Sequence, residues 1–263
     1  IGQDTLGNAF KSILHIAEEN GLSTGLVSTS SVTHATPAAF IAHELSRNDY
    51  EAIAADFLDT DIDLFIGGGY NHFANRNDGL NLVDSLKARK YQVTERMSEV
   101  NQIESGKLAG FTAEGHNPRY SEGRGDMLPQ ATGKAIELLN KNDKGFFLMV
   151  EGSQIDWGGH DNDINYVLEE TLDFDRAVGI ALDFAKNDRN TLVVVTSDHE
   201  TGGLSIVDGN LDEHEVTPSF GTRHHSSVMV PVFAFGPGAE KFTGVYDNTA
   251  FFGKFMEIYG FQN

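Results

Sequence analysis

Three residues that can bind a metal lie close together in the segment EGSQIDWGGHD, residues 151–161. Glu151 directly follows an apolar run, and Asp156 and His160 are four residues apart. One helical turn at this spacing directs a carboxylate and an imidazole to the same side. That pair suits a divalent ion of the zinc type. The alternative is a solvated loop, and the two glycines before His160 favour a tight turn over a long regular helix.

A second group lies in TSDHETGG, residues 196–203, directly after another apolar run. Asp198 and His199 are adjacent, so on an extended chain their side chains point to opposite sides. One ion binds both only if the backbone turns, and the Gly202-Gly203 pair permits such a turn. The alternative is an aspartate that caps a helix and a histidine on the surface.

Other candidates stand further from these groups. One histidine of the pair His224-His225 can complete a site begun by Asp156 and His160. Arg47 follows a predicted helix, where an arginine is usually a solvated charge but can also grip an anion beside a metal. Five other histidines have no partner pattern and are predicted to be structural or exposed: His15, His43, His72, His116 and His214.

The composition limits the class of protein. The 263 residues are 40% hydrophobic, enough for one large α/β domain or two small ones. The net charge of -20 argues against nucleic acid as a partner. There is no cysteine, so any metal must be held by histidine, carboxylate or hydroxyl groups. No apolar stretch is long enough for a membrane span, and Ile1 opens no signal-peptide pattern. We expect a chain that is processed, trimmed or incomplete.

Apolar runs alternate with segments of helical period, a pattern typical of a parallel sheet with crossover helices. The predicted strands are residues 25–28, 63–66, 145–150, 191–196 and 230–235, and 191–196 has the clearest pattern of a buried strand. The predicted helices are residues 4–20, 37–46, 49–58, 80–89, 127–141, 164–186 and 248–259. Residues 91–125 are polar and are predicted to be an insertion in a single domain spanning residues 1–263.

The candidate residues follow the carboxyl ends of these strands, where ligands collect in open α/β sheets. Glu151 follows one strand, Asp198 and His199 follow another, and Thr36 with a Ser-rich stretch follows a third. The glycine run 67–69 follows a fourth strand but lacks the Lys-Ser/Thr of a phosphate-binding loop, so we predict a packing role for it. This convergence predicts a site at one edge of the sheet.

Four motifs in this order resemble those of alkaline phosphatases: THATPAAF, VEGSQIDWGGH, TSDHETGG, and HS before VPVFAFGPG. They span residues 33–238, and the resemblance extends to small bacterial enzymes of marine or cold-adapted type. The resemblance implies a three-layer α/β sandwich with a mostly parallel central sheet flanked by helices. It also implies a periplasmic or secreted homodimer that hydrolyses phosphate monoesters at alkaline pH and releases inorganic phosphate.

The resemblance further implies two zinc ions and one magnesium ion. One zinc would be held by Asp156, His160 and His225. The family's histidine ligand directly precedes a small hydroxyl residue, which selects the second histidine of the pair. The other zinc would be held by Asp198 and His199, together with an aspartate that this chain lacks.

The third ion, usually magnesium, would be held by Glu151 and Thr36 with the same missing aspartate. Arg47 would clamp the phosphate. His34 and Trp157 stand where some family members carry Asp and Lys. The resemblance implies that both tune the third metal site and the affinity for phosphate.

The start of the chain departs from the family pattern. The family's nucleophilic serine, which forms a phosphoserine intermediate, follows an aspartate upstream of the segment that resembles residues 1–20. No Asp-Ser of this chain has the matching context, because Asp84-Ser85 lies in a predicted helix. We therefore expect the N-terminal part of the fold to be absent from this chain. That part would either be a separate chain or have been lost by processing.

Two other functions stay open. The chain could belong to another phosphoryl-transfer enzyme with the same metals, a phosphodiesterase or a mutase, and a preference for diesters would favour that. It could instead be a catalytically inactive metal-binding fragment, whose exposed sheet edge would demand a partner. A folded, metal-loaded monomer that is inert on phosphate esters would favour the fragment.

Overall fold

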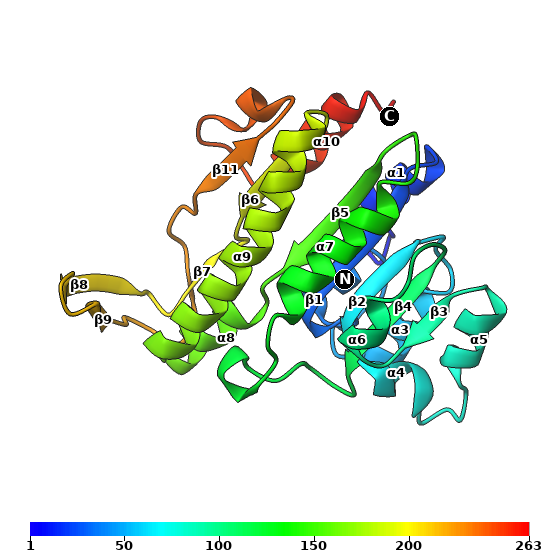
Figure 1. The fold of residues 1–263 in the computed structure, drawn as a ribbon, viewed down its shortest axis with the longest axis horizontal. Coiled ribbons are helices and arrows are strands. Elements are labelled where there is room, and N and C mark those ends of the chain that lie inside the picture. The colour runs from blue at the N-terminus through cyan, green and yellow to red at the C-terminus, as the bar shows by residue number, and fades with distance from the viewer. Residues whose placement is uncertain (263) are drawn as a thin grey trace.

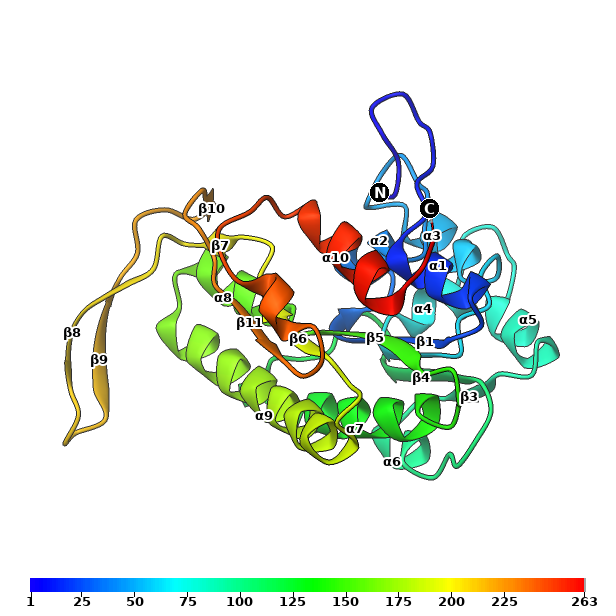
Figure 2. The same ribbon diagram turned by 90° about the horizontal axis from the view of Figure 1, so that it is seen from above.

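The computed structural model describes residues 1–262, and helices cover both faces of a central parallel sheet (Figures 1 and 2). The strand order is β3-β4-β2-β1-β5, and every pairing is parallel. The predicted α/β architecture is therefore confirmed. The five strands are β1 (Ser23–Ser31), β2 (Leu64–Gly68), β3 (Gln92–Thr94), β4 (Leu108–Ala113) and β5 (Phe146–Glu151).

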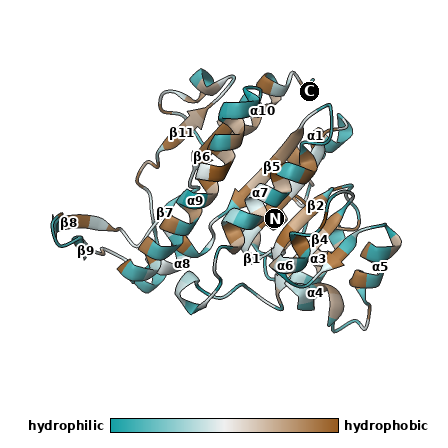
Figure 3. Ribbon diagram, viewed as in Figure 1, coloured by the Kyte–Doolittle hydropathy of each residue, from teal (hydrophilic) through white to brown (hydrophobic). Residues whose placement is uncertain are grey.

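Each face of the sheet has its own apolar core because successive strand residues point to opposite sides. Phe65 of β2 packs with one set of helices, whereas its neighbours Leu64 and Ile66 pack with the other. Figure 3 shows that β2 and β5 are largely hydrophobic, while hydrophobic and hydrophilic residues alternate along the helices. The first core includes residues of α1 (Ile13–Glu19), α3 (Tyr50–Asp56), α4 (Tyr70–Ala74), α5 (Leu82–Ala88) and α10 (Ala250–Tyr259).

The second core includes residues of α6 (Met97–Val100), α7 (Met127–Leu139) and α9 (Ile164–Asp188). Four further helical elements are short: α2 (Ala35–Ala39), α8 (Gln154–Asp161), η1 (Tyr120–Glu122) and η2 (Ala239–Phe242). None of the helices in residues 1–262 combines the length and the apolar character needed to cross a membrane.

The C-terminal part of the chain forms three two-stranded sheets. β6 (Val193–Thr196) pairs with β11 (Val232–Phe235), and β7 (Glu200–Thr201) pairs with β10 (His225–Ser226). The hairpin of β8 (Ser205–Asn210) and β9 (Glu215–Ser219) projects from the body of the molecule (Figure 2). All three pairings are antiparallel.

A wide cleft separates β5 from β6. Among residues 1–262, β5 pairs only with β1 and β6 pairs only with β11, so each strand leaves one edge open to the cleft. The cleft has a volume of about 1660 Å³ and is lined by all of β5, by much of β6 and by Phe255 and Tyr259 of α10. The strand predicted for residues 191–196 is present as the shorter β6, and it is half-buried to exposed rather than buried.

The predicted strands are all present, whereas two predicted helices have wrong limits. The helix predicted for residues 4–20 begins only at Ile13. The reason is a turn in which the Asp4 carboxylate accepts hydrogen bonds from the backbone N–H groups of Leu6 and Asn8. The helix predicted for residues 37–46 ends at Ala39.

Residues 91–125, predicted to be an insertion, contribute directly to the main sheet. They contain β3 and β4, and β4 lies between β3 and β2. Ala109 and Phe111 of β4 are buried in the first core. This range is therefore integrated with the sheet.

Candidate metal and phosphate site

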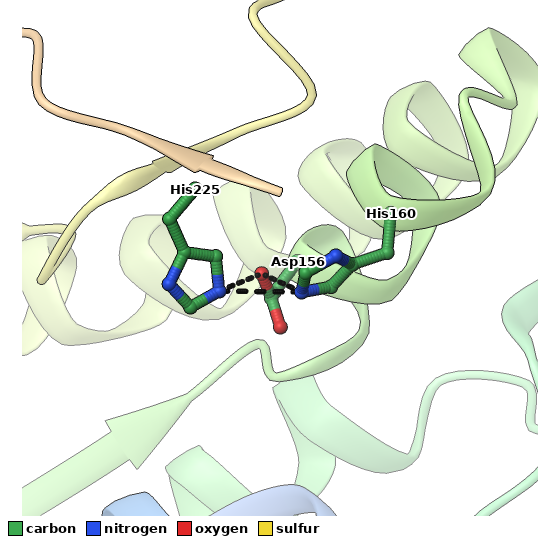
Figure 4. Close-up of side chains that lie close together, drawn as sticks. All are labelled: Asp156, His160 and His225. Atoms are coloured by element: carbon green, nitrogen blue, oxygen red, sulfur yellow. Dashed lines mark hydrogen bonds and ion pairs between the residues drawn. The ribbon is translucent and has the colours of Figure 1, made fainter. Parts of the chain in front are cut away.

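Asp156 and His160 lie on one face of α8, as their spacing predicts (Figure 4). The expected tight turn was wrong, because α8 is a regular helix of eight residues. The two glycines instead let this helix pack closely. A Cβ atom on Gly159 would lie 2.7 Å from the carbonyl oxygen of Thr201, and one on Gly158 would lie 2.8 Å from the backbone nitrogen of Val167.

His225 on β10 completes a three-residue cluster with this pair (Figure 4). The candidate ligand atoms all lie within 4.8 Å of one another. Asp156 Oδ1 is 3.4 Å from His160 Nε2 and 3.6 Å from His225 Nε2. The carbonyl of Arg223 lies 2.7 Å from His160 Nδ1, so a proton on Nδ1 leaves Nε2 free for a metal. Two imidazoles and a carboxylate are a donor set that fits zinc.

Asp198 and His199 lie at the same end of the cleft, just beyond β6. Their side chains meet despite being adjacent, with His199 Nε2 3.2 Å from Asp198 Oδ2. The turn after them uses Gly202 and Gly203, both with positive φ. The His199 ring stacks on His225 with 3.5 Å between centroids, so this pair lies next to the first cluster.

Glu151 ends β5 and is surrounded by hydroxyl groups. Ser28 Oγ donates to Glu151 Oε2 at 2.7 Å, and Thr36 and Ser153 also form hydrogen bonds with this carboxylate. Burial raises the pKa of Glu151, these hydroxyls lower it, and nearby Asp198 raises it. A carboxylate among oxygen donors fits magnesium, which prefers oxygen ligands.

Arg47, His34 and Trp157 lie beside these groups. Arg47 is exposed and lines the cleft, together with His34. The His34 ring meets Trp157 and His116 edge-on, at centroid distances of 5.8 and 5.3 Å. Burial, followed by the charges of His116 and Arg47, lowers the pKa of His34 to about 4. His34 is therefore neutral at neutral and alkaline pH.

The cleft brings the predicted ligands together from elements far apart in sequence. It is lined by Thr36, Arg47, Glu151, Asp156, His160, Asp198, His199 and His225. Two neighbours of this group are not among the predicted site residues. Thr201 contacts both Asp156 and His199, and His116 contacts His34 and Trp157. Thr201 could have been found, because residues two apart on a strand share a face and Thr201 follows His199 at that spacing. No sequence pattern identifies His116.

The glycine run 67–69 has a packing environment. A Cβ atom on Gly68 would lie 2.0 Å from the carbonyl oxygen of Gly115, and one on Gly67 would lie 2.9 Å from that of Ser28. Gly69 has a φ of 102°. These close backbone contacts agree with the packing role predicted for the run.

The known proteins that this chain resembles are alkaline phosphatases. The alkaline phosphatase family profile matches residues 1–216. Alkaline phosphatase 3 of Bacillus subtilis is 39% identical over 254 residues, which cover 94% of this chain but only 54% of that protein. The chain thus spans about half the length of this relative.

Solved structures of cold-environment enzymes align over nearly the whole chain. The alkaline phosphatase of the Antarctic bacterium TAB5 is 43% identical with a TM-score of 0.93, covering 100% of this chain and 79% of that one. A variant of that enzyme has magnesium bound in its M3 site. The cold-active enzyme of the psychrophile Shewanella sp. is 31% identical with a TM-score of 0.91, covering 98% of this chain and 81% of that one. The chain belongs to the alkaline phosphatase family.

Proposed function

We propose that this protein hydrolyses phosphate monoesters at alkaline pH with two zinc ions and one magnesium ion. The observation that carries the proposal is the cluster of Asp156, His160 and His225 beside Asp198 and His199 at one end of a single cleft. Two neighbouring sites of this kind suit the in-line displacement of a phosphate ester. The bound ions would stabilise negative charge on the attacking and leaving oxygens and reverse the local field of a protein with net charge -20.

The residues of the chain have distinct roles in this proposal. Asp156, His160 and His225 hold one zinc, and Asp198 and His199 hold the other. Magnesium is assigned to Glu151 and Thr36, whose oxygen donors suit it, and the magnesium in the M3 site of the TAB5 variant supports this assignment.

The proposed phosphate contact is the guanidinium of Arg47. Its two-pronged geometry matches two phosphoryl oxygens. Neutral His34 lines the cleft beside it, the indole of Trp157 packs against the His34 ring, and both tune the third metal site without adding charge.

The attacking serine is proposed to lie outside residues 1–263, on a segment that enters the cleft as a strand between β5 and β6. Both strands leave an edge open there, and their apolar side chains form the walls. The carboxyl end of β5 leads to Glu151, so a strand parallel to β5 would deliver the residue that follows it to the metal ligands. Attack by that serine on phosphorus would break the bond to the ester oxygen, release the alcohol and give a phosphoserine, which water would then hydrolyse to serine and inorganic phosphate.

The test is hydrolysis of p-nitrophenyl phosphate at alkaline pH by the full-length protein with zinc and magnesium. We expect turnover that a chelator abolishes. The change His160→Ala should lower it by at least about 100-fold, because even residues that only support a metal ligand typically contribute 10–100-fold. His214→Ala is the matched control, because His214 is exposed near the tip of the β8–β9 hairpin.

Unchanged turnover in His160→Ala would overturn the metal assignment. Faster turnover of bis(p-nitrophenyl) phosphate than of the monoester would indicate a diesterase instead of a monoesterase.

From its family we further propose an exported protein, periplasmic or secreted, that forms a homodimer. A monomeric mass in solution would contradict the homodimer.

A further inference from the structure

Thr201 on β7 lies between ligands assigned to the two zinc ions. Its hydroxyl oxygen is 2.5 Å from Asp156 Oδ1 and 3.2 Å from His199 Nδ1. Asp156 belongs to the cluster on α8 and β10, whereas His199 follows β6. A single hydroxyl therefore contacts one ligand of each site.

The chemistry of the three groups sets the direction of both hydrogen bonds. An ionised carboxylate only accepts, so the Thr201 hydroxyl must donate to Asp156. The threonine oxygen is then left to accept a hydrogen bond from the N–H group at His199 Nδ1. In that tautomer His199 Nε2 keeps its lone pair, and it is Nε2 that lies beside Asp198 at 3.2 Å.

We propose that Thr201 is a positioning residue that links the two metal sites. It orients the Asp156 carboxylate and fixes the metal-binding tautomer of His199 through one ordered pair of hydrogen bonds. This inference rests on the proposed metal centre and assigns Thr201 a role in metal affinity.

The backbone around Thr201 holds the hydroxyl in place. Thr201 pairs with His225 across the β7–β10 ladder, and the neighbouring pair Glu200 and Ser226 is joined by a side-chain hydrogen bond. On its other side, a Cβ atom on Gly159 would lie 2.9 Å from Thr201 Cβ. Thr201 is thus fixed between α8 and β10, which carry the three ligands of the first cluster.

The test compares Thr201→Val, which keeps the shape but loses the hydroxyl, with Thr201→Ser, which keeps the hydroxyl. Zinc affinity of the full-length protein is measured by competition with a chromophoric chelator. We expect affinity at both sites to fall about 10–100-fold in Thr201→Val, the range typical for groups that support metal ligands. Thr201→Ser should restore most of it. Thr217→Val on exposed β9 is the matched control and should bind zinc like the wild type.

The absorption spectrum of the cobalt-substituted protein gives a second readout that does not depend on activity. We expect Thr201→Val to change the ligand-field bands and Thr201→Ser to keep them. If Thr201→Val does not fold, Thr201→Ala replaces it with the same expectation.

Zinc affinity and cobalt spectrum unchanged in a folded Thr201→Val would overturn the inference while leaving the metal centre intact. An equal loss in Thr201→Ser would overturn it as well, because packing rather than the hydroxyl would then be responsible. A wild-type protein that binds no zinc would instead overturn the proposed function on which the inference rests.

Discussion

Asp63 is a carboxyl group whose surroundings differ strongly from water. It lies directly before β2, is half-buried, and accepts a hydrogen bond from the backbone N–H of Thr24 at 2.9 Å. Burial raises its pKa, and the hydrogen bond and the charge of Lys107 counter only part of that shift. The folded protein therefore holds this proton more tightly than the unfolded chain does.

The sign of the resulting pH dependence follows from that shift. The contribution of Asp63 to stability is complete below about pH 4, the unfolded value, and is lost as pH rises through the raised native pKa. Each unit of the shift corresponds to about 1.4 kcal/mol. Asp63→Asn keeps an acceptor for Thr24 and removes the titration. We expect the free energy of unfolding of Asp63→Asn, relative to wild type, to increase from pH 4 to pH 7.

Urea unfolding of the metal-free protein at several pH values measures this difference. The control is Asp143→Asn, at an exposed position in the turn before β5, which should show no such trend. A wild-type-to-Asp63→Asn difference that stays constant between pH 4 and pH 7 would exclude the predicted linkage.

At the scale of single residues, candidate metal ligands can be predicted from the sequence because metal binding depends on residue type. Asp156 and His160 have their helical spacing in any context. Thr201 and Ser28 differ, because a hydroxyl acquires its role only from the carboxylate placed beside it. Ser28 lies 123 residues from Glu151 in sequence, and only the pairing of β1 with β5 brings them together.

At the scale of elements, a buried charge cluster fastens the segment before α7 to α9. Arg124 donates to Glu170 at 2.5 and 3.0 Å and to Asp173 at 2.9 Å, and each of the three side chains is at most 1% exposed. Glu170 also accepts from the backbone N–H of Tyr120 at 2.9 Å. This cluster holds the segment that follows His116, and His116 contacts Trp157 and the cleft residue His34.

We predict that Arg124→Met destabilises the protein by about 3–5 kcal/mol, because it leaves Glu170 buried without a cation and Asp173 with only the partly exposed Arg176 at 2.8 Å. Arg119→Met is the matched control. Arg119 forms a partly exposed ion pair with Asp161 at 2.8 Å, and its loss should lower stability by no more than about 1 kcal/mol. Urea unfolding measures both values. Equal effects of the two changes would show that burial of the cluster does not govern its contribution.

The predicted helices and strands are correct where a long apolar pattern dominates. The prediction is wrong where a side chain accepts the backbone N–H hydrogen bonds that a helix would use. The run 164–186 yields α9 and the run 145–150 yields β5. The stretch 4–12 has the same helical period, but the Asp4 carboxylate takes the local N–H groups and leaves Leu6 85% exposed. Nor does any sequence pattern predict the strand order or the cleft, since both depend on contacts between distant segments.

At the scale of the whole molecule, the cleft divides two bodies that the metal ligands would join. The main sheet carries Glu151 on one side, and the β6–β11 unit leads to Asp198 on the other. α7 and α9 pack together behind the cleft. Bound cations would thus connect the two sides at the carboxyl ends of the strands, where a chain of net charge -20 gathers several of its carboxylates.

Zinc should therefore raise the melting temperature of the whole chain. At a free zinc concentration of 100 times Kd, binding to the native state alone stabilises it by about 2.7 kcal/mol. At roughly 2–4 °C per kcal/mol for a domain approaching this size, the expected rise is about 5–10 °C. Calorimetry with and without zinc measures it, and a chelator should reverse it.

The double change His160→Ala and His225→Ala separates site binding from other effects of zinc. It removes two of three ligands in the cluster of Figure 4 but leaves the other eight histidines, so zinc bound by the unfolded chain changes little. We expect the double variant to lose most of the rise in melting temperature. An equal rise in melting temperature in both proteins would mean that zinc stabilises the chain at another place. Metal binding in the cleft would then not be what holds its two sides together.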